Sequence, residues 1–150
     1  MIRRRDKDGR VRAGGQTLVE FAVVTFLTVI LLLSIVEISR MVLVYTTVAN
    51  AARAGARYAI VHGGTRIGGG VDGPSGPAGN PPQVVTVVRN FASAGLIRSS
   101  LLAITVSYPG ASNAPGQQVS VKVVYPYDPF TSYLPLRVRL GSTSQGVIAF

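Results

Sequence analysis

The sequence predicts an α+β protein: a long N-terminal helix that can cross a membrane, then a small head with one short helix on an antiparallel β-sheet. Three features predict this arrangement. Residues 21–36 form a run of sixteen residues without a charge. Small side chains then continue a helical spacing as far as His62. Alternating apolar residues in 102–108 and 118–125 indicate two strands.

The first fifteen residues form a basic leader. They hold six basic and two acidic residues, a net +4 of the chain's +9, and lack apolar periodicity. This composition predicts a disordered segment on the cytoplasmic side of a membrane. The remaining positive charge is scattered, which argues against a nucleic-acid partner. The chain contains no cysteine, so disulfides and thiolate metal sites are excluded.

Residues 17–39 are the predicted membrane span. Their 23 residues make a helix about 35 Å long, against a hydrocarbon core of about 30 Å. The span's charged residues, Glu20 and Glu37, lie near its two ends, where a carboxylate costs less than at the midplane. A cleaved secretory signal is the alternative, but this run is longer than such signals and no small-x-small cleavage site follows it. The cations before the span place the N-terminus in the cytoplasm and the head outside it.

The helical pattern continues through residues 40–62, so residues 16–62 are predicted to form one helix about 70 Å long. Gly63 and Gly64 are its expected stop. Small residues let another backbone approach this part of the helix, and the candidates for helix packing are Ala52, Gly55, Ala56 and Ala59. Glu37 and Arg40, three residues apart, can pair on one face. Such a pair is either a solvated ion pair at the membrane surface or a contact used in assembly, and the sequence leaves both alternatives open.

The C-terminal part begins after a Gly/Pro-rich stretch at residues 63–80, which is predicted to be a flexible loop. Residues 81–150 then form the head. Asn80 is expected to cap its helix, with Pro81 in the first turn and Val84, Val88 and Phe91 on the apolar face. Strands are predicted at 102–108 and 118–125. Residues 136–140 and 146–150 are the two candidates for a third strand. Asp128 is expected to be a turn residue in the loop at residues 126–135, which precedes them.

The N-terminal residues resemble a known processing site. "GQTLVEF", Gly15 to Phe21, looks like the site of type IV pilin-like proteins, in which cleavage follows a Gly and a Glu is the fifth residue of the mature chain. The wider stretch resembles TadE-like proteins, the minor pilins or pseudopilins of Tad/Flp tight-adherence pilus systems. The matching pieces are "GQTLVEFAVV", "EISR" at residues 37–40 and "NAARAGARYA" at residues 50–59. In processing sites of this type Tyr often follows the Glu, whereas this chain has Phe21.

The resemblance implies roles for three residues. Gly15 and Gln16 would flank the bond cut by a prepilin peptidase, so residues 1–15 would be removed and the pilin-like helix would start at Gln16. Glu20 would pair with the new α-amine of a neighbouring subunit and fix the axial register of assembly. The simpler alternative is a Glu20 that only reaches the lipid headgroups.

The implied function is that of a non-enzymatic subunit, in the bacterial cytoplasmic membrane or an extracellular pilus. Its partners would be the membrane, the peptidase, other pilin or pseudopilin subunits and the assembly machinery. A single-pass anchor whose head binds another envelope component is the alternative. An anchored enzyme has no candidate site, because the acids lie in separate segments and His62 lies at a helix end. No metal, cofactor or small-molecule substrate is expected.

Overall fold

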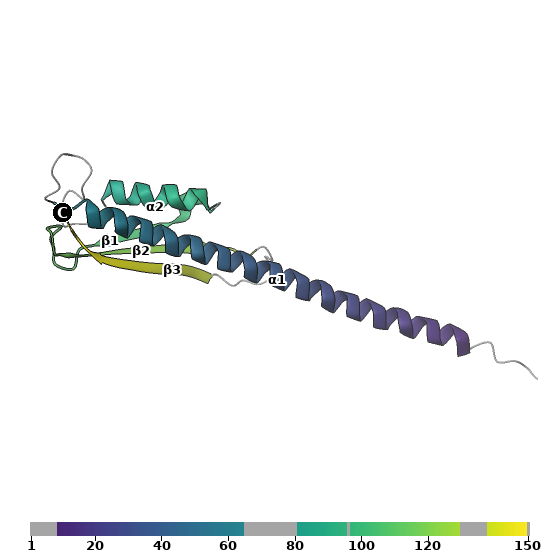
Figure 1. Cartoon of the computed structure of the whole chain (residues 1–150). Coiled ribbons are helices and arrows are strands. Elements are labelled where there is room, and N and C mark those ends of the chain that lie inside the picture. The colour runs from purple at the N-terminus through teal and green to yellow at the C-terminus, as the bar shows by residue number, and fades with distance from the viewer. Residues whose placement is uncertain (1–8, 65–80, 96, 130–137, 150) are drawn as a thin grey trace, which may run out of the picture. The chain divides into compact units, whose positions relative to one another are not determined.

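The computed structural model describes residues 9–64, 81–95, 97–129 and 138–149, with side chains from Gly15 onward in the first helix. Its elements are helices α1 (Gly9–Val61) and α2 (Pro82–Ala94), the short 3-10 helix η1 (Ser99–Leu101), and strands β1 (Ala103–Ser107), β2 (Gln118–Tyr127) and β3 (Val138–Val147) (Figure 1). The predicted α+β layout is therefore confirmed. The chain divides into two units, Met1–Ser39 and Arg40–Phe150, and the second is called the head here.

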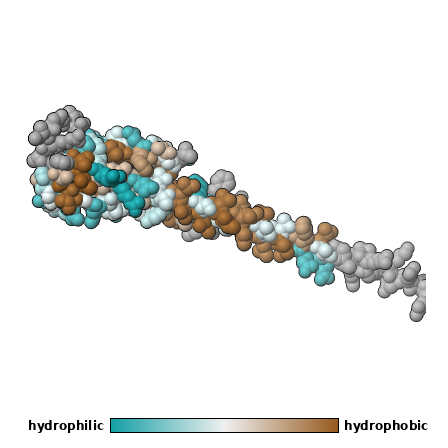
Figure 2. Space-filling model, in the orientation of Figure 1, coloured by the Kyte–Doolittle hydropathy of each residue, from teal (hydrophilic) through white to brown (hydrophobic). Residues whose placement is uncertain are grey.

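The described part of the first unit is helix with an apolar surface. Every residue from 15 to 36 is exposed, including large side chains such as Leu18, Phe21 and Leu31. Figure 2 shows this apolar surface along the N-terminal part of α1. The hydroxyls of Thr28 and Ser34 each donate to the carbonyl four residues earlier at 2.8 Å, so they are satisfied without water. By length and composition, one helix in the described part of the chain can cross a membrane, which fits a single-pass membrane protein.

Helix α1 begins at Gly9, whereas the sequence analysis placed its start at Gln16. The leader, residues 1–15, was expected to be disordered. That expectation is wrong for residues 9–15, which are helical, and residues 1–8 lie outside the described part of the chain. Each glycine costs about 1 kcal/mol relative to alanine in a helix, but the good helix formers Arg10, Arg12 and Ala13 precede Gly14 and Gly15, and a long apolar helix follows them. The helix ends at Val61, one residue before the expected end.

The head contains a three-stranded antiparallel sheet in the order β1-β2-β3. In the middle strand Val119, Val121 and Val123 are fully buried, while Lys122 between them is exposed on the other face. Val121 pairs with Val106 of β1 and Ser144 of β3. The sheet therefore has one apolar face for the core and one polar face.

Strand β3 is one continuous strand from Val138 to Val147, where the sequence suggested two separate segments around a polar centre. Strand β2 also runs further than expected, to Tyr127, and so includes Pro126. The β1–β2 ladder ends at Val124, so at Pro126 the register joins β2 only to β3. A proline is tolerated there because it interrupts one ladder rather than two.

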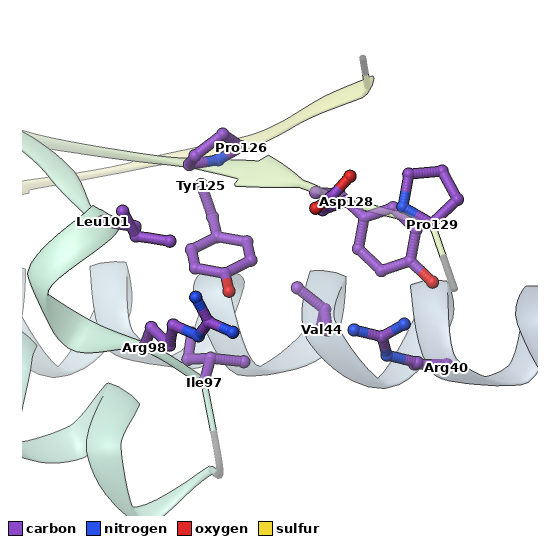
Figure 3. A pocket seen from close by; sticks show the side chains of 10 residues that line it. Arg40, Val44, Ile97, Arg98, Leu101, Tyr125, Pro126, Asp128 and Pro129 are labelled. Atoms are coloured by element: carbon purple, nitrogen blue, oxygen red, sulfur yellow. The ribbon is translucent and has the colours of Figure 1, made fainter. Parts of the chain in front are cut away.

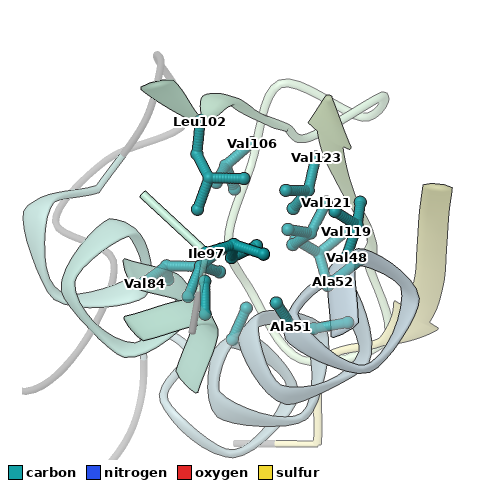
Figure 4. Close-up of a cluster of buried hydrophobic side chains, with 14 of the residues drawn as sticks. Val48, Ala51, Ala52, Val84, Ile97, Leu102, Val106, Val119, Val121 and Val123 are labelled. Atoms are coloured by element: carbon teal, nitrogen blue, oxygen red, sulfur yellow. The ribbon is translucent and has the colours of Figure 1, made fainter. Parts of the chain in front are cut away.

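The core of the head joins the second part of α1 to α2 and the sheet (Figure 4). Helix α1 comes so close at Gly55 that a Cβ there would overlap Val88 Cγ2 of α2 and lie 3.3 Å from Val121 Cγ1 of β2. The α1 side chains buried in this core are Val44, Val48, Ala51, Ala52, Ala56 and Ala59. The compact unit therefore starts at Arg40, and its core is larger than residues 81–150 could build alone.

Helix α2 starts one residue later than expected. Pro81 is its N-cap residue and Pro82 its first residue, while Asn80, the predicted cap, lies outside the described residues. Val84, Val88 and Ala92 are buried, and Phe91 at the edge of this face is 43% exposed. Gly95 follows the helix, and a Cβ there would overlap Thr47 of α1. The residues after α2 are thereby held close to the first turns of the head's part of α1.

Candidate functional site

The residues predicted for processing and for assembly lie on the exposed surface of α1. Gly15, Gln16 and Glu20 are all exposed, and a Cβ built at Gly15 would meet nothing within 4 Å. Glu20 lies among large exposed apolar side chains, with Val19 and Phe21 as its sequence neighbours. The site therefore presents one carboxylate on an apolar helix surface, accessible to a group from outside the chain.

The spacing between Gln16 and Glu20 is one turn of this helix, a rise of about 6 Å. The bond between Gly15 and Gln16 lies inside regular helix, so its backbone takes part in helical hydrogen bonding. A peptidase can reach that backbone only after a local opening. Gly14 and Gly15 directly precede this bond, and an opening here costs less than at a pair of alanines, because glycine gains the most conformational freedom on leaving a helix.

Arg40 has a neighbour that the sequence did not suggest. Its guanidinium carbon lies 5.4 Å from the ring centroid of Tyr127, which is a cation–π distance. The suggested pairing of Arg40 with Glu37 stays a prediction. The contact with Tyr127 ties the first residue of the head's part of α1 to the end of β2.

The four small residues suggested for helix packing lie in the head's own core. Ala52 and Ala59 are fully buried, Ala56 nearly so, and Gly55 lies against Val88 and Val121. At Gly55 the atoms that approach α1 belong to side chains of α2 and β2 of the same chain. A role of this stripe toward a second subunit stays a prediction.

A cavity of about 340 Å³ lies beside Arg40 within the head. Three segments far apart in the sequence line it: Arg40 and Val44 of α1, Ile97 to Leu101 after α2, and Tyr125 to Pro129 at the end of β2. Figure 3 shows Tyr125 projecting toward α1 and Arg98 entering the same space. An adjacent hollow of about 360 Å³ shares Leu101 and Asp128 and adds Val138 and Arg139. We call the two together the arginine pocket.

No pattern in the sequence indicated this pocket. Asp128 was interpreted as a turn residue; it is exposed directly after β2 and lines both hollows. Arg98, Tyr125 and Arg139 were not singled out. The available sequence pattern was the run "YPYDPF" at residues 125–130, in which two tyrosines alternate along a strand and so point to the same face.

The remaining titratable groups of the head do not form a reactive cluster in the part that the structure describes. His62 stacks on Tyr58 with a centroid distance of 3.8 Å, and its Nδ1 lies 2.9 Å from the Tyr58 carbonyl oxygen. Burial raises the pKa of the Tyr108 hydroxyl to about 12. Among the described residues, no group of three or more His, Asp or Glu side chains is arranged to hold a metal ion.

The comparisons with known proteins locate the resemblance in α1. Residues 15–57 match the TadE-like protein family. The match confirms the family that the sequence resembles, and its first residue is Gly15. We call residues 15–57 the TadE-like segment. It ends within α1, before α2 and the three strands. The searches of curated proteins and of solved structures gave no match.

Proposed function

We propose that this chain is a non-enzymatic minor pilin or pseudopilin of a Tad/Flp-type pilus system, processed by a prepilin peptidase between Gly15 and Gln16. The observation that carries the proposal is the TadE-like match that starts at Gly15, at the boundary between the basic leader and an exposed apolar helix. The family indicates an association with the pilus. Processing, entry into the fibre and the partner subunits are the proposed part.

Glu20 supports an assembly role through its surroundings. A lone carboxylate in the apolar region costs about 2.5–3.5 kcal/mol at the centre of a membrane helix and less near its end. A basic group can offset that cost. Cleavage after Gly15 would create an α-amine on Gln16, one turn before Glu20. Pairing between subunits would then set their axial offset at about one helical turn, roughly 6 Å.

The first test is the mature N-terminus. Intact mass and N-terminal sequencing of membrane-extracted protein should show a chain that starts at Gln16. Gly15→Arg should leave residues 1–15 attached, because a long charged side chain replaces hydrogen at the bond to be cut. A wild-type chain that keeps Met1 in cells with an active prepilin peptidase would refute processing.

The second test separates a pilin from an anchor. Glu20→Gln keeps the size of the side chain and removes its charge, and Glu20→Leu removes polarity altogether. Both should remain cleaved and inserted, with insertion easier by up to about 2–3 kcal/mol, yet lose subunit crosslinking and pilus yield. Glu20→Asp, shorter by one methylene, should be intermediate. Val24→Leu, an apolar exchange one turn further along, is the control and should assemble normally. Normal assembly of Glu20→Leu would favour the membrane-anchor function instead.

The third test concerns orientation. The basic leader before the span favours a cytoplasmic N-terminus and an extracytoplasmic head. A reporter active only outside the cytoplasm, fused after Phe150, should be active. Activity of a cytoplasmic reporter alone would invert the topology and refute the pilin function with it.

A further inference from the structure

We propose that the arginine pocket binds the phosphate of an anionic phospholipid headgroup. The proposal concerns the head and does not depend on leader cleavage or on entry into a pilus. The cavity of about 340 Å³ is within the size range of small-ligand sites. Four properties of the pocket indicate this ligand: its charge, the orientation of Arg40, its apolar rim and its place along α1.

The charge of the pocket suits a phosphate. Arg40, Arg98 and Arg139 line the two hollows, and among the lining residues that the structure describes Asp128 is the one acid. In the described part of the chain neither Arg98 nor Arg139 makes an ion pair, and both side chains are exposed. A guanidinium presents several N–H donors in a planar fork that matches the oxygens of a phosphate. Among the described residues the pocket therefore offers guanidinium donors that face solvent, and a net positive charge.

The ring of Tyr127 orients one of these donors. The Arg40 guanidinium carbon lies 5.4 Å from the ring centroid. The ring limits the positions that the guanidinium can take, so less side-chain entropy is lost when a phosphate binds. Tyr125 projects into the same cavity from the same face of β2 (Figure 3). Tyrosine is typical of the headgroup layer, because it has an apolar ring and a polar tip.

An apolar rim distinguishes a lipid from a soluble phosphate ester. Leu101, which lines both hollows, is 45% exposed, and Val138 in the second hollow is 36% exposed. On α1 the residues after Arg40 also expose apolar side chains, with Leu43 at 65%. Exposed leucine and valine beside arginine suit the boundary between headgroups and acyl chains. They contribute nothing to binding a free phosphate in water.

The place of the pocket along α1 also supports a lipid, rather than a soluble molecule, as the source of the phosphate. Arg40 directly follows residues 17–39, the predicted span. The headgroup layer on each side of a bilayer is about 5–8 Å thick, from the total thickness and that of the hydrocarbon core. Arg40 and Val44, the two α1 residues that line the cavity, are one turn apart, about 6 Å. The α1 residues of the pocket thus begin directly after the predicted span in the sequence, and the helical rise between them is comparable to the thickness of a headgroup layer.

The test uses the full chain with one fluorescent reporter. The sequence contains no tryptophan, so Leu101→Trp introduces a single indole at the rim of the pocket. The protein is placed in nanodiscs of phosphatidylcholine with a rising fraction of phosphatidylglycerol. We expect a saturable shift of tryptophan emission. On this background Arg98→Gln should raise the half-maximal phosphatidylglycerol fraction about fivefold, the effect of about 1 kcal/mol per basic residue at an anionic surface.

Arg57→Gln is the matched control, because it removes the same charge from an exposed position on α1 about 25 Å beyond Arg40. It should leave the titration unchanged. Arg40→Gln should act like Arg98→Gln. If loss of its contact with Tyr127 unfolds the head, as circular dichroism would show, Arg98→Gln decides alone, since its exposed side chain makes no hydrogen bond in the described part of the chain.

Three results would overturn the proposal. The first is no shift with phosphatidylglycerol. The second is an equal effect of Arg98→Gln and Arg57→Gln, which would assign the lipid preference to overall charge, including that of the leader. The third is the same emission shift from inorganic phosphate added to phosphatidylcholine nanodiscs, which would assign the pocket to a soluble phosphate.

Discussion

The two parts of helix α1 are apolar for different reasons. Residues 15–36 are exposed all around the helix, so nothing in the described chain covers their large leucine, valine and phenylalanine side chains. In residues 40–61 one side is buried, and the buried residues there are mostly alanines and valines. A membrane covers side chains of any size, whereas a close protein contact requires small ones. Side-chain size therefore separates the two environments better than hydrophobicity does.

The two proposed functions also fall in different parts of the helix. The exposed part carries Gly15 and Glu20, which can be reached from outside the chain. The buried part positions Arg40 and Val44 for the arginine pocket through its packing on α2 and β2. The TadE-like match covers both parts up to residue 57. The similarity to the family thus includes the side of α1 that builds the head's core as well as the predicted span.

The largest expected effects on folding and on membrane insertion come from two variants, each of which places one charge in one part of the helix. Ala52→Arg puts a cation at a fully buried position, which costs on the order of 3–5 kcal/mol when no partner is present. The head should lose its cooperative thermal transition while the protein stays in the membrane fraction. Leu31→Arg should do the reverse: it costs insertion about 2.5–3.5 kcal/mol and leaves the transition of the detergent-solubilised head unchanged. Alkaline extraction and circular dichroism measure the two effects.

A variant that impaired both properties equally would contradict this division. It would mean that the head folds only when residues 15–36 are inserted, or that insertion requires a folded head. Arg53→Leu is the control for both measurements, because its side chain is exposed on the head's part of α1.

A smaller effect is expected from two glycines of the same helix. Gly55→Leu should destabilise the head by about 1–3 kcal/mol, because its Cβ would overlap Val88 and crowd Val121. Gly15→Leu should leave the melting temperature of the head unchanged, since the space around Gly15 is open. Chemical denaturation of both variants in the same detergent measures the difference. Equal stability of the two would show that α2 and β2 yield at Gly55 without cost.

Much of the fold was predictable because local patterns determine it. The charge-free run identified the apolar helix, and alternation identified β1 and β2. Strand β3 was divided into two segments because its centre, Gly141 to Gln145, has no apolar alternation. The buried valines of β2 supply the apolar partner for Ser142 and Ser144, so this strand depends on its neighbour rather than on its own sequence.

The candidate site, like the fold, was predictable only where a local pattern determines it. Gly15, Gln16 and Glu20 follow one another along one helix, so sequence spacing was enough to propose them. The small-residue stripe predicted a close backbone approach, but the sequence could not say which backbone, and the structure brings α2 and β2 of the same chain there. The arginine pocket joins residues near 40, 98, 127 and 139. Only tertiary packing brings these together, so no local pattern predicted it.

The smallest expected effect is a change in how the stability of the head depends on pH. Tyr108 is buried, its hydroxyl has no hydrogen-bond partner among the described residues, and burial raises its pKa from 10.0 to about 12. Below pH 10 the hydroxyl is neutral in both the folded and unfolded chain. Between pH 10 and 12 the unfolded chain releases this proton while the folded chain keeps it, so stability falls as pH rises, by at most about 1.4 kcal/mol per pH unit.

Tyr108→Phe should remove that part of the loss and be neutral or slightly stabilising at neutral pH, because it deletes a buried group that lacks a partner among the described residues. Denaturation of the detergent-solubilised protein at pH 8 and pH 11, for wild type and Tyr108→Phe, measures the difference, with the exposed Tyr45→Phe as control. An unchanged pH dependence in Tyr108→Phe would mean that the hydroxyl reaches water or a partner in solution, and the core around Tyr108 would then be less closed than the structure shows.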